Sequence, residues 1–277
     1  MKYLFFQLLP KNLLSRLMGV LADIKFPSPF LLSIIKAYSY LYGINMNEMA
    51  KSPNELKNFN EFFTRKLKPE LRPIDPGEKS VISPVDGTIS EFGAIKEGLL
   101  TQTKGIFYTL EDLVGEKYSK LFEQGYFITI YLSPADYHRI HTPVSGKVSN
   151  FNYFSGNLWP VNRFGVEEIG ALLAINERIV TPIKNKVGIV GLVKVGALVV
   201  GKITLDYSDI SSNSKGLKSL HLPVLPEKNY DKGDEIGKFM LGSTVILLFQ
   251  KNQFKPGELH RDKKIRMGEK IGEMISS

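Results

Sequence analysis

Cysteine is absent from the 277-residue sequence. Its absence excludes disulfide bonds, zinc sites built from thiolates and cysteine nucleophiles, and it fits a reducing compartment. Long apolar runs are also lacking, because no stretch reaches the roughly 18 apolar residues of a membrane-spanning helix. The sequence has neither a block of like charges nor a nucleic-acid-binding signature, which makes nucleic acid the weakest candidate partner.

The composition that remains is that of a globular protein. Apolar residues make up 43% and charged residues 23% of the chain, and its length allows one large domain or two modest ones with a sizeable core. The 36 basic and 28 acidic residues leave a net charge of +8. This excess favours an anionic partner, such as a membrane surface or a phosphorylated substrate.

Residues 1–57 carry two amphipathic helical patterns. Each has an apolar stripe at helical spacing: Leu13, Leu17, Val20, Leu21 and Ile24 in the first, and Phe30, Leu31, Ile34, Ile35, Tyr38 and Leu41 in the second. The stripes either face the core or form an interfacial membrane anchor with basic residues beside it. The opening "MKYLFFQLLP" is short and has no signal-peptidase motif after it, which argues against export.

Residues 58–277 predict a second, mainly β region. "NFNEFFTRKL" reads as a short helix with Asn60 as its N-cap, and valine- and isoleucine-rich strands then alternate with turns. "SPVDGTIS" and "TPVSGKVS" repeat one corner pattern at an offset of 59 residues. We therefore expect an α+β protein: N-terminal amphipathic helices followed by a mainly antiparallel β catalytic domain of barrel-sandwich type.

Two of the four histidines, His138 and His141, lie close together in "YLSPADYHRIHTP". Ser133 and Asp136 suit the N-cap and third position of a helical turn. If that turn extends to His138, the two imidazoles point the same way, whereas in a regular strand they face opposite sides. Two satisfied structural histidines are the alternative, and a zinc site is disfavoured because thiolates and a zincin glutamate are lacking.

Asp86 and Ser243 each have an ordinary structural interpretation. Asp86 lies in an Asp-Gly turn, and Ser243 follows Gly242 at the start of the apolar run "STVILLF". The G-x-S-x-G motif of serine hydrolases is absent, and a serine that leads into a strand does not form a nucleophile elbow. An Asp–His–Ser set is present, but without a hydrolase context.

Several blocks together resemble the phosphatidylserine decarboxylase family of pyruvoyl-dependent membrane enzymes. They are "FNEFFTRKLKPELRPID", "SPVDGTIS", "YLSPADYHRIHTPVSGKV", "NERIV" and "GKFMLGSTVILLF", in the order and spacing of that family. The Leu-Gly-Ser-Thr block alone is weak, but five ordered blocks around a D-Y-H-R-x-H core are specific. Asp86 and His141 stand at matching positions, whereas the N-terminal region diverges.

The resemblance implies self-cleavage between Gly242 and Ser243, which turns Ser243 into a covalent pyruvoyl group. The serine hydroxyl attacks the preceding carbonyl, and the resulting ester is eliminated. By the resemblance, His141 is the base and Asp86 orients it, in the manner of a triad. Fragments 1–242 and 243–277 are expected to stay associated.

The same resemblance implies the reaction. The pyruvoyl ketone forms a Schiff base with phosphatidylserine and withdraws electrons as CO₂ leaves, which yields phosphatidylethanolamine. His138 matches the second histidine of the family and is the candidate proton donor. The implied protein is a homo-oligomer, such as a dimer, without a metal, bound peripherally to the cytoplasmic side of the cell membrane through residues 1–57.

Two other functions are compatible with these residues. One is a pyruvoyl enzyme that acts on a free amino acid or on another phospholipid head group. The N-terminal stripes argue against a free amino acid as the substrate. Vesicle binding distinguishes a lipid-binding enzyme from a soluble one that acts on a free amino acid. The other is a lipoyl-like β module that serves as a binding scaffold, and a denaturing gel identifies it because it needs no self-cleavage.

Overall fold

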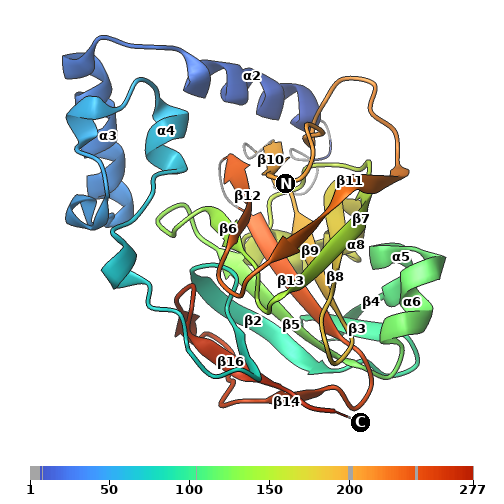
Figure 1. Ribbon diagram of the computed structural model, residues 1–277. Coiled ribbons are helices and arrows are strands. Elements are labelled where there is room, and N and C mark those ends of the chain that lie inside the picture. Colours follow the sequence, from blue (N-terminus) through green and yellow to red (C-terminus); the bar gives the residue numbers. More distant parts are fainter. Residues whose placement is uncertain (1–6, 8, 104, 199–201, 241–242, 277) are drawn as a thin grey trace.

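A computed structural model describes residues 7, 9–103, 105–198, 202–240 and 243–276. The helices and 3₁₀ turns are α2 (Lys11–Asp23), α3 (Ser28–Tyr42), η1 (Met46–Glu48), η2 (Pro53–Glu55), α4 (Phe59–Phe63), η3 (Pro69–Leu71), α5 (Leu110–Val114), α6 (Glu116–Phe122), α7 (Arg163–Glu168) and α8 (Leu172–Ile175). Figure 1 shows α2, α3 and α4 gathered beside one end of the β structure.

The main sheet has eight strands, all paired antiparallel, in the order β11-β7-β8-β9-β13-β5-β2-β15. These are β2 (Gly87–Ala94), β5 (Tyr126–Leu132), β7 (Gly146–Phe154), β8 (Arg178–Lys184), β9 (Ile189–Val195), β11 (Leu220–Tyr230), β13 (Ser243–Phe249) and β15 (Lys264–Ile265). The two outer strands do not pair with each other, so the sheet stays open rather than closing into a barrel. The expected α+β class is confirmed.

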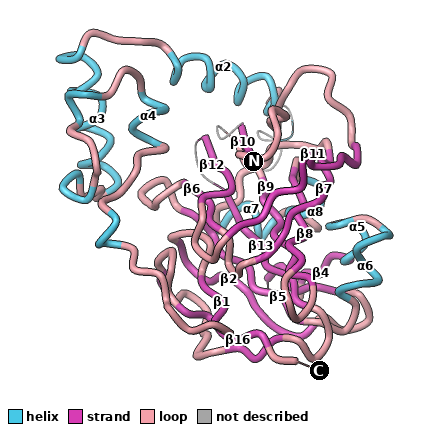
Figure 2. Tube along the Cα trace, viewed as in Figure 1, coloured by secondary structure: helices cyan, strands magenta, loops and turns pink. Residues whose placement is uncertain are grey.

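Three smaller sheets surround the main one (Figure 2). They contain β1 (Ser80–Ile82), β16 (Lys270–Met274) and β14 (Phe254–Pro256); β10 (Lys202–Leu205), β12 (Glu235–Met240) and β6 (Arg139–His141); and β3 (Leu99–Thr103) and β4 (Ile106–Thr109).

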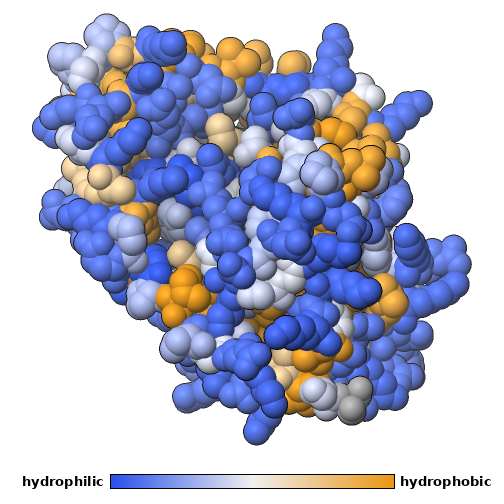
Figure 3. Space-filling view, viewed as in Figure 1, coloured by the Kyte–Doolittle hydropathy of each residue, from blue (hydrophilic) through white to orange (hydrophobic). Residues whose placement is uncertain are grey.

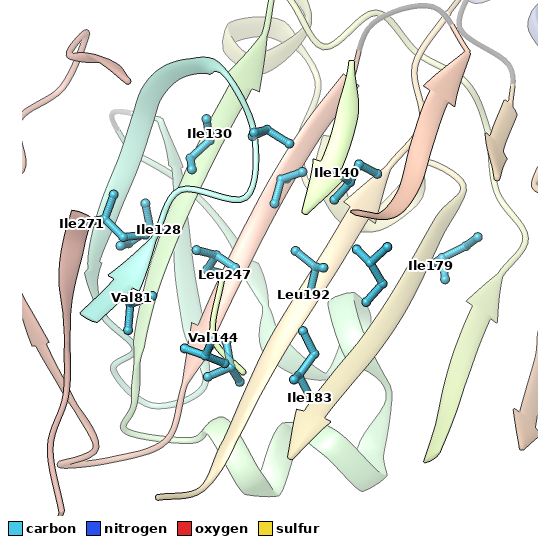
Figure 4. Close-up of a cluster of buried hydrophobic side chains, with 14 of the residues drawn as sticks. Val81, Ile128, Ile130, Ile140, Val144, Ile179, Ile183, Leu192, Leu247 and Ile271 are labelled. Carbon is cyan, nitrogen blue, oxygen red and sulfur yellow. The ribbon is translucent and has the colours of Figure 1, made fainter. Parts of the chain in front are cut away.

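Each face of the main sheet packs against its own hydrophobic cluster. On one face, alternate residues such as Val245 and Leu247 join β6 and β12 in a core of isoleucine, valine and leucine side chains (Figure 4). On the other face, Ile246 and Leu248 pack with α5, α6 and α8. A strand buried on both faces is apolar along its whole length, and this explains the run that follows Ser243.

The helical region packs against the β region through a third cluster. Leu31 and Ile35 of α3 are buried with Leu56 and Phe62. The helix predicted around Asn60 is present, but its N-cap is Asn58, which accepts from the Glu61 N–H. Asn60 is buried instead and donates to Asp23 at 2.6 Å, so it ties α4 to the end of α2.

The repeated corner pattern has a structural counterpart. Two reciprocal bonds join the corners: Ile82 N–H to the Pro143 carbonyl at 3.0 Å, and His141 N–H to the Pro84 carbonyl at 2.8 Å. A Cβ on Gly146 would lie 2.7 Å from the Lys184 carbonyl oxygen, and one on Gly87 would meet the Tyr131 carbonyl oxygen at 2.5 Å. Both corners therefore require glycine, because a neighbouring strand passes too close for a side chain.

Gly146→Ala should lower the free energy of unfolding by about 1–3 kcal/mol, the usual cost of overpacking against a backbone that cannot yield. Gly19→Ala in α2 is the matched control. Its Cβ would meet no atom within 4 Å, so the better helix propensity of alanine should leave stability equal or about 1 kcal/mol higher. Urea unfolding measures both variants, and an unchanged midpoint for Gly146→Ala would contradict the close approach.

Candidate active site

Ser243 is the first residue of β13, as the sequence predicts for a polar triplet before a buried strand. It pairs with Leu132 of β5 and is 1% exposed. Its hydroxyl has no hydrogen-bond partner among the described residues, which is unusual for a buried polar atom. Ser243 lies on the same face of the sheet as Val245, because side chains alternate along a strand. The predicted cleavage partner, Gly242, lies outside the described residues.

The turn predicted at Ser133 is present but shorter than expected. The Ser133 N–H and hydroxyl both donate to the Asp136 carboxylate, at 2.7 and 2.8 Å, but no helix forms between Ser133 and His138, and β6 begins at Arg139. The expected helical turn that reaches His138 is therefore absent. The two rings have different neighbours, Phe63 for His138 and Tyr137 for His141.

His138 is fully buried directly before β6, and its ring centroid lies 4.1 Å from that of Phe63. Its Nδ1 is 2.7 Å from the Asp136 carbonyl oxygen. Because a carbonyl only accepts, Nδ1 carries the proton and Nε2 has a lone pair, for which the structure provides no partner. Burial, opposed by the bond to the Asp136 carbonyl and aided by the positive charge of Arg65, lowers the pKa of His138 to about 3. The ring is neutral at physiological pH.

His141 has the same tautomer but a different neighbourhood. Its Nδ1 donates to the Gly233 carbonyl at 2.7 Å, and its Nε2 accepts from the Tyr137 hydroxyl at 3.2 Å. Burial lowers the pKa of His141, and the negative charges of Glu235 and Asp86 oppose that effect. The ring is held at both nitrogens.

Asp86 is buried in the corner before β2. Its carboxylate accepts hydrogen bonds from an arginine and a backbone N–H rather than from a histidine. Arg72 Nε donates to both carboxylate oxygens, at 2.8 and 3.0 Å, and the Met267 N–H donates to Oδ1 at 2.8 Å. Asp86 and Arg72 border a hollow of about 280 Å³ whose wall also includes Tyr137. Asp86 is thus a fixed anion with a guanidinium partner.

The structure does not join Asp86, His141 and Ser243 as the predicted triad requires. No hydrogen bond in the described part of the chain links Asp86 to His141 or His141 to Ser243. His138 is closer to the strand of Ser243, because its carbonyl accepts from the N–H of Phe239 at 2.9 Å and β12 ends just before Ser243. Phe239 belongs to the same cluster as Val245, whereas the His138 ring packs on Phe63 of the opposite cluster. Within the described residues, His138 Nε2 and the Ser243 hydroxyl are both buried and unpaired.

Sequence reasoning missed the partners of these residues. Arg72, Tyr137 and Arg65 lie inside the blocks that carry the family resemblance, but neither spacing nor periodicity indicated which side chain each would meet. Arg65 is 6% exposed and donates to the Ala135 carbonyl at 3.0 Å. An arginine beside two buried phenylalanines in "FFTRK" was the available signal, since buried cations need a partner.

Comparison with known proteins identifies the family of this chain. Residues 59–273 match the family described as phosphatidylserine decarboxylase. A phosphatidylserine decarboxylase proenzyme of Brevibacillus brevis is 42% identical over 267 residues, which cover 95% of this chain and 94% of that protein. The proenzymes of Anaeromyxobacter sp. (strain K) and Myxococcus xanthus are 41% and 39% identical, each over 96% of this chain and 95% of its own length. The chain belongs to the phosphatidylserine decarboxylase family.

Burial of a neutral His138 makes stability depend on pH. Its folded pKa lies below the unfolded value, so its contribution is complete above about pH 6.5 and is lost as the pH falls toward 3. As the pH falls from 6.5 to 5, the titration of His138 should lower the free energy of unfolding by about 2 kcal/mol. His138→Asn keeps a donor for the Asp136 carbonyl and should remove that part of the slope. Both proteins should carry Ser243→Ala, so that each unfolds as one chain, and identical slopes would show that His138 titrates normally.

Proposed function

We propose that the chain is the precursor of a pyruvoyl-dependent enzyme that converts phosphatidylserine to phosphatidylethanolamine and CO₂. The observation that carries this proposal is the buried, unpaired hydroxyl of Ser243 at the start of the central strand, within a chain of this family. A structural serine at such a place would bond its hydroxyl to a nearby carbonyl. A hydroxyl without a partner suits a nucleophile.

Self-cleavage uses the backbone on either side of Ser243. The hydroxyl oxygen attacks the carbonyl carbon of Gly242, the C–N bond breaks, and the nitrogen of Ser243 takes up a proton, which leaves an ester. Removal of the α-proton expels the carboxylate of fragment 1–242. The remaining dehydroalanine takes up water and releases ammonia, so fragment 243–277 begins with a ketone. A serine is required because its oxygen is both nucleophile and leaving atom.

The two histidines divide the proton transfers in this proposal. His141 takes the hydroxyl proton for cleavage, and to do so its Nε2 must exchange the Tyr137 hydroxyl for that of Ser243. Asp86 supplies a fixed negative charge that favours the protonated form of His141. His138 has an unpaired Nε2, which would take up a proton in the decarboxylation step and return it to the carbanion.

The residues around Ser243 fit a pyruvoyl group. Its small side chain is enclosed at the head of β13, and Val245–Phe249 behind it are all buried. Once formed, the ketone supplies an electron sink for the charge left when CO₂ departs. The protein holds that end of the chain in place through β5 and β9.

The two fragments should remain one molecule. Fragment 243–277 contributes β13 to the middle of the main sheet, and β14, β15 and β16 pair with strands or with each other nearby. Burial of a single large aliphatic or aromatic side chain stabilises by about 1.5–3 kcal/mol, and β13 buries five in a row after Thr244. Cleavage breaks one peptide bond and leaves these contacts intact.

Residues 1–57 are proposed to dock on an anionic membrane surface. The apolar stripe of α2 points outward: Leu17 is 53% and Val20 65% exposed, while Lys11 and Ser15 face the protein. Hydrophobic residues accordingly line the top rim of the molecule in Figure 3. Lys25 and Lys36 are exposed nearby and provide charge complementarity to anionic lipid. Among the described residues, no helix is long and apolar enough to span a bilayer.

The histidines should be separable by mutation. Ser243→Ala and His141→Ala should remain single chains, whereas wild-type protein runs as two pieces on a denaturing gel and as one species on native chromatography. His138→Ala should cleave but release CO₂ from phosphatidylserine about 10²–10⁴-fold more slowly, the usual effect of losing one general acid. Cleavage and labelled CO₂ are quantified on the same preparation. Failure of His138→Ala to cleave would assign His138 to maturation instead.

The outward stripe of α2 can be tested without disturbing the core. Leu17→Asp combined with Val20→Asp should weaken binding to vesicles of phosphatidylglycerol and phosphatidylcholine at least tenfold and leave self-cleavage unchanged. Phe107→Asp is the matched control, because Phe107 is 54% exposed on β4, far from α2 (Figure 1). Vesicle co-sedimentation measures binding. Equal loss in both variants would mean that the effect is not specific to α2.

A further inference from the structure

A basic hollow of about 400 Å³ lies between the helical region and the β6–β12 pair. Its wall contains five cationic side chains and one carboxylate: Lys51, Arg65, Lys66, Arg139, Lys238 and Glu61. The carboxylate accepts from the backbone N–H of Lys57 at 2.9 Å. Glu235 pairs with both Arg139, at 2.6 Å, and Lys238, at 3.6 Å, so the five cations of the wall still outnumber Glu61 and Glu235. The hollow therefore favours an anion.

Arg65 distinguishes this hollow from a patch of surface lysines. Its side chain is 94% buried, its Nη2 donates to the Ala135 carbonyl, and its Nε and Nη1 have no hydrogen-bond partner. Within the described residues it forms no ion pair, and its closest ring contact places Cζ 5.3 Å from the centre of Phe62. The carboxylates of Asp86, Glu48 and Asp136 act on its charge from a distance, but none of them bonds to Nε or Nη1. Two buried donor atoms without an acceptor are costly, and an anion in the hollow would supply one.

The hollow adjoins the proposed reaction centre. Lys238 pairs across the small sheet with Arg139, the residue after His138, and β12 continues toward Ser243. Arg65 is close enough to His138 for its charge to lower the pKa of that ring. In a serine phospholipid only a methylene group and an ester oxygen separate the amine-bearing carbon from the phosphorus. A phosphate bound here would therefore leave the serine moiety beside His138.

We propose that this hollow binds the phosphodiester monoanion of a phospholipid head group, with Arg65 as its buried anchor and Lys238 at its mouth. The identity of the lipid as the substrate rests on the proposed function, but the phosphate chemistry rests on the hollow alone. Arginine suits this task because its planar fork matches two phosphate oxygens. The bound anion also offsets the charge of Arg65, so the pKa of His138 rises when substrate occupies the site.

Binding can be measured apart from catalysis. The probe is dihexanoyl phosphatidylserine below its micelle concentration, in equilibrium dialysis with protein carrying Ser243→Ala. Adding Arg65→Met should weaken binding about tenfold or more, and Lys238→Met by a smaller factor. Lys186→Met is the charge-matched control, because Lys186 is 93% exposed, and it should bind normally. Unchanged affinity in a folded Arg65→Met protein overturns the proposal; if that variant fails to fold, unchanged affinity in Lys238→Met does so.

Competition identifies the source of the phosphate. Glycerophosphoserine should displace the probe from the Ser243→Ala protein far better than inorganic phosphate at equal concentration. Equal displacement would mean a general phosphate site and would overturn the head-group assignment. In the processed enzyme, with Ser243 intact, Arg65→Met should raise KM for phosphatidylserine in nonionic micelles by a larger factor than it lowers kcat, whereas Lys186→Met should change neither.

The two proposals can fail separately. Head-group binding that depends on Arg65 in a chain that never cleaves would support the hollow and contradict the pyruvoyl mechanism. Cleavage with normal head-group binding by Arg65→Met would do the reverse.

Discussion

The pairing of β13 between β5 and β9 determines where every other part of the site can be. It places Ser243 opposite Leu132 at the end of a strand that is buried on both faces. A reactive residue at this point is held as rigidly as the core itself, since the strand cannot shift by one residue without exposing its apolar side chains. The same pairing holds fragment 243–277 in the sheet after the chain is cut.

The helical region reverses the usual arrangement of an amphipathic helix. In α2 the polar face meets the protein: the Lys11 ammonium lies 3.9 Å from the centre of the Trp159 ring, and Asn12 donates to the Gly156 carbonyl at 3.0 Å. The leucines are left to solvent. Apolar surface exposed in this way favours transfer to another apolar phase, and a bilayer is the phase that contains the proposed substrate.

Much of this arrangement could be predicted from the sequence, because the patterns involved are local. Alternation and turn residues indicated the strands, and the triplet before β13 indicated its first residue. The apolar stripe of α2 was also correct, but its direction was not determined, since periodicity does not distinguish a core-facing stripe from a membrane-facing one. The helical turn expected to reach His138 is absent, because the turn at Ser133 ends at Asp136 and β6 begins at Arg139.

Pairings between distant segments could not be predicted. Arg72 binds Asp86 only because the connector after α4 passes the corner before β2, and Arg65 reaches Ala135 across 70 positions of sequence. The contact between Phe63 and His138 has the same origin.

These long-range contacts place α4 and the residues after it between the helical region and the proposed reaction centre. A phosphate bound in the proposed hollow would make its contacts away from the reacting carbon. The head group would then arrive in a fixed orientation, which is how binding energy remote from the reacting carbon contributes to rate.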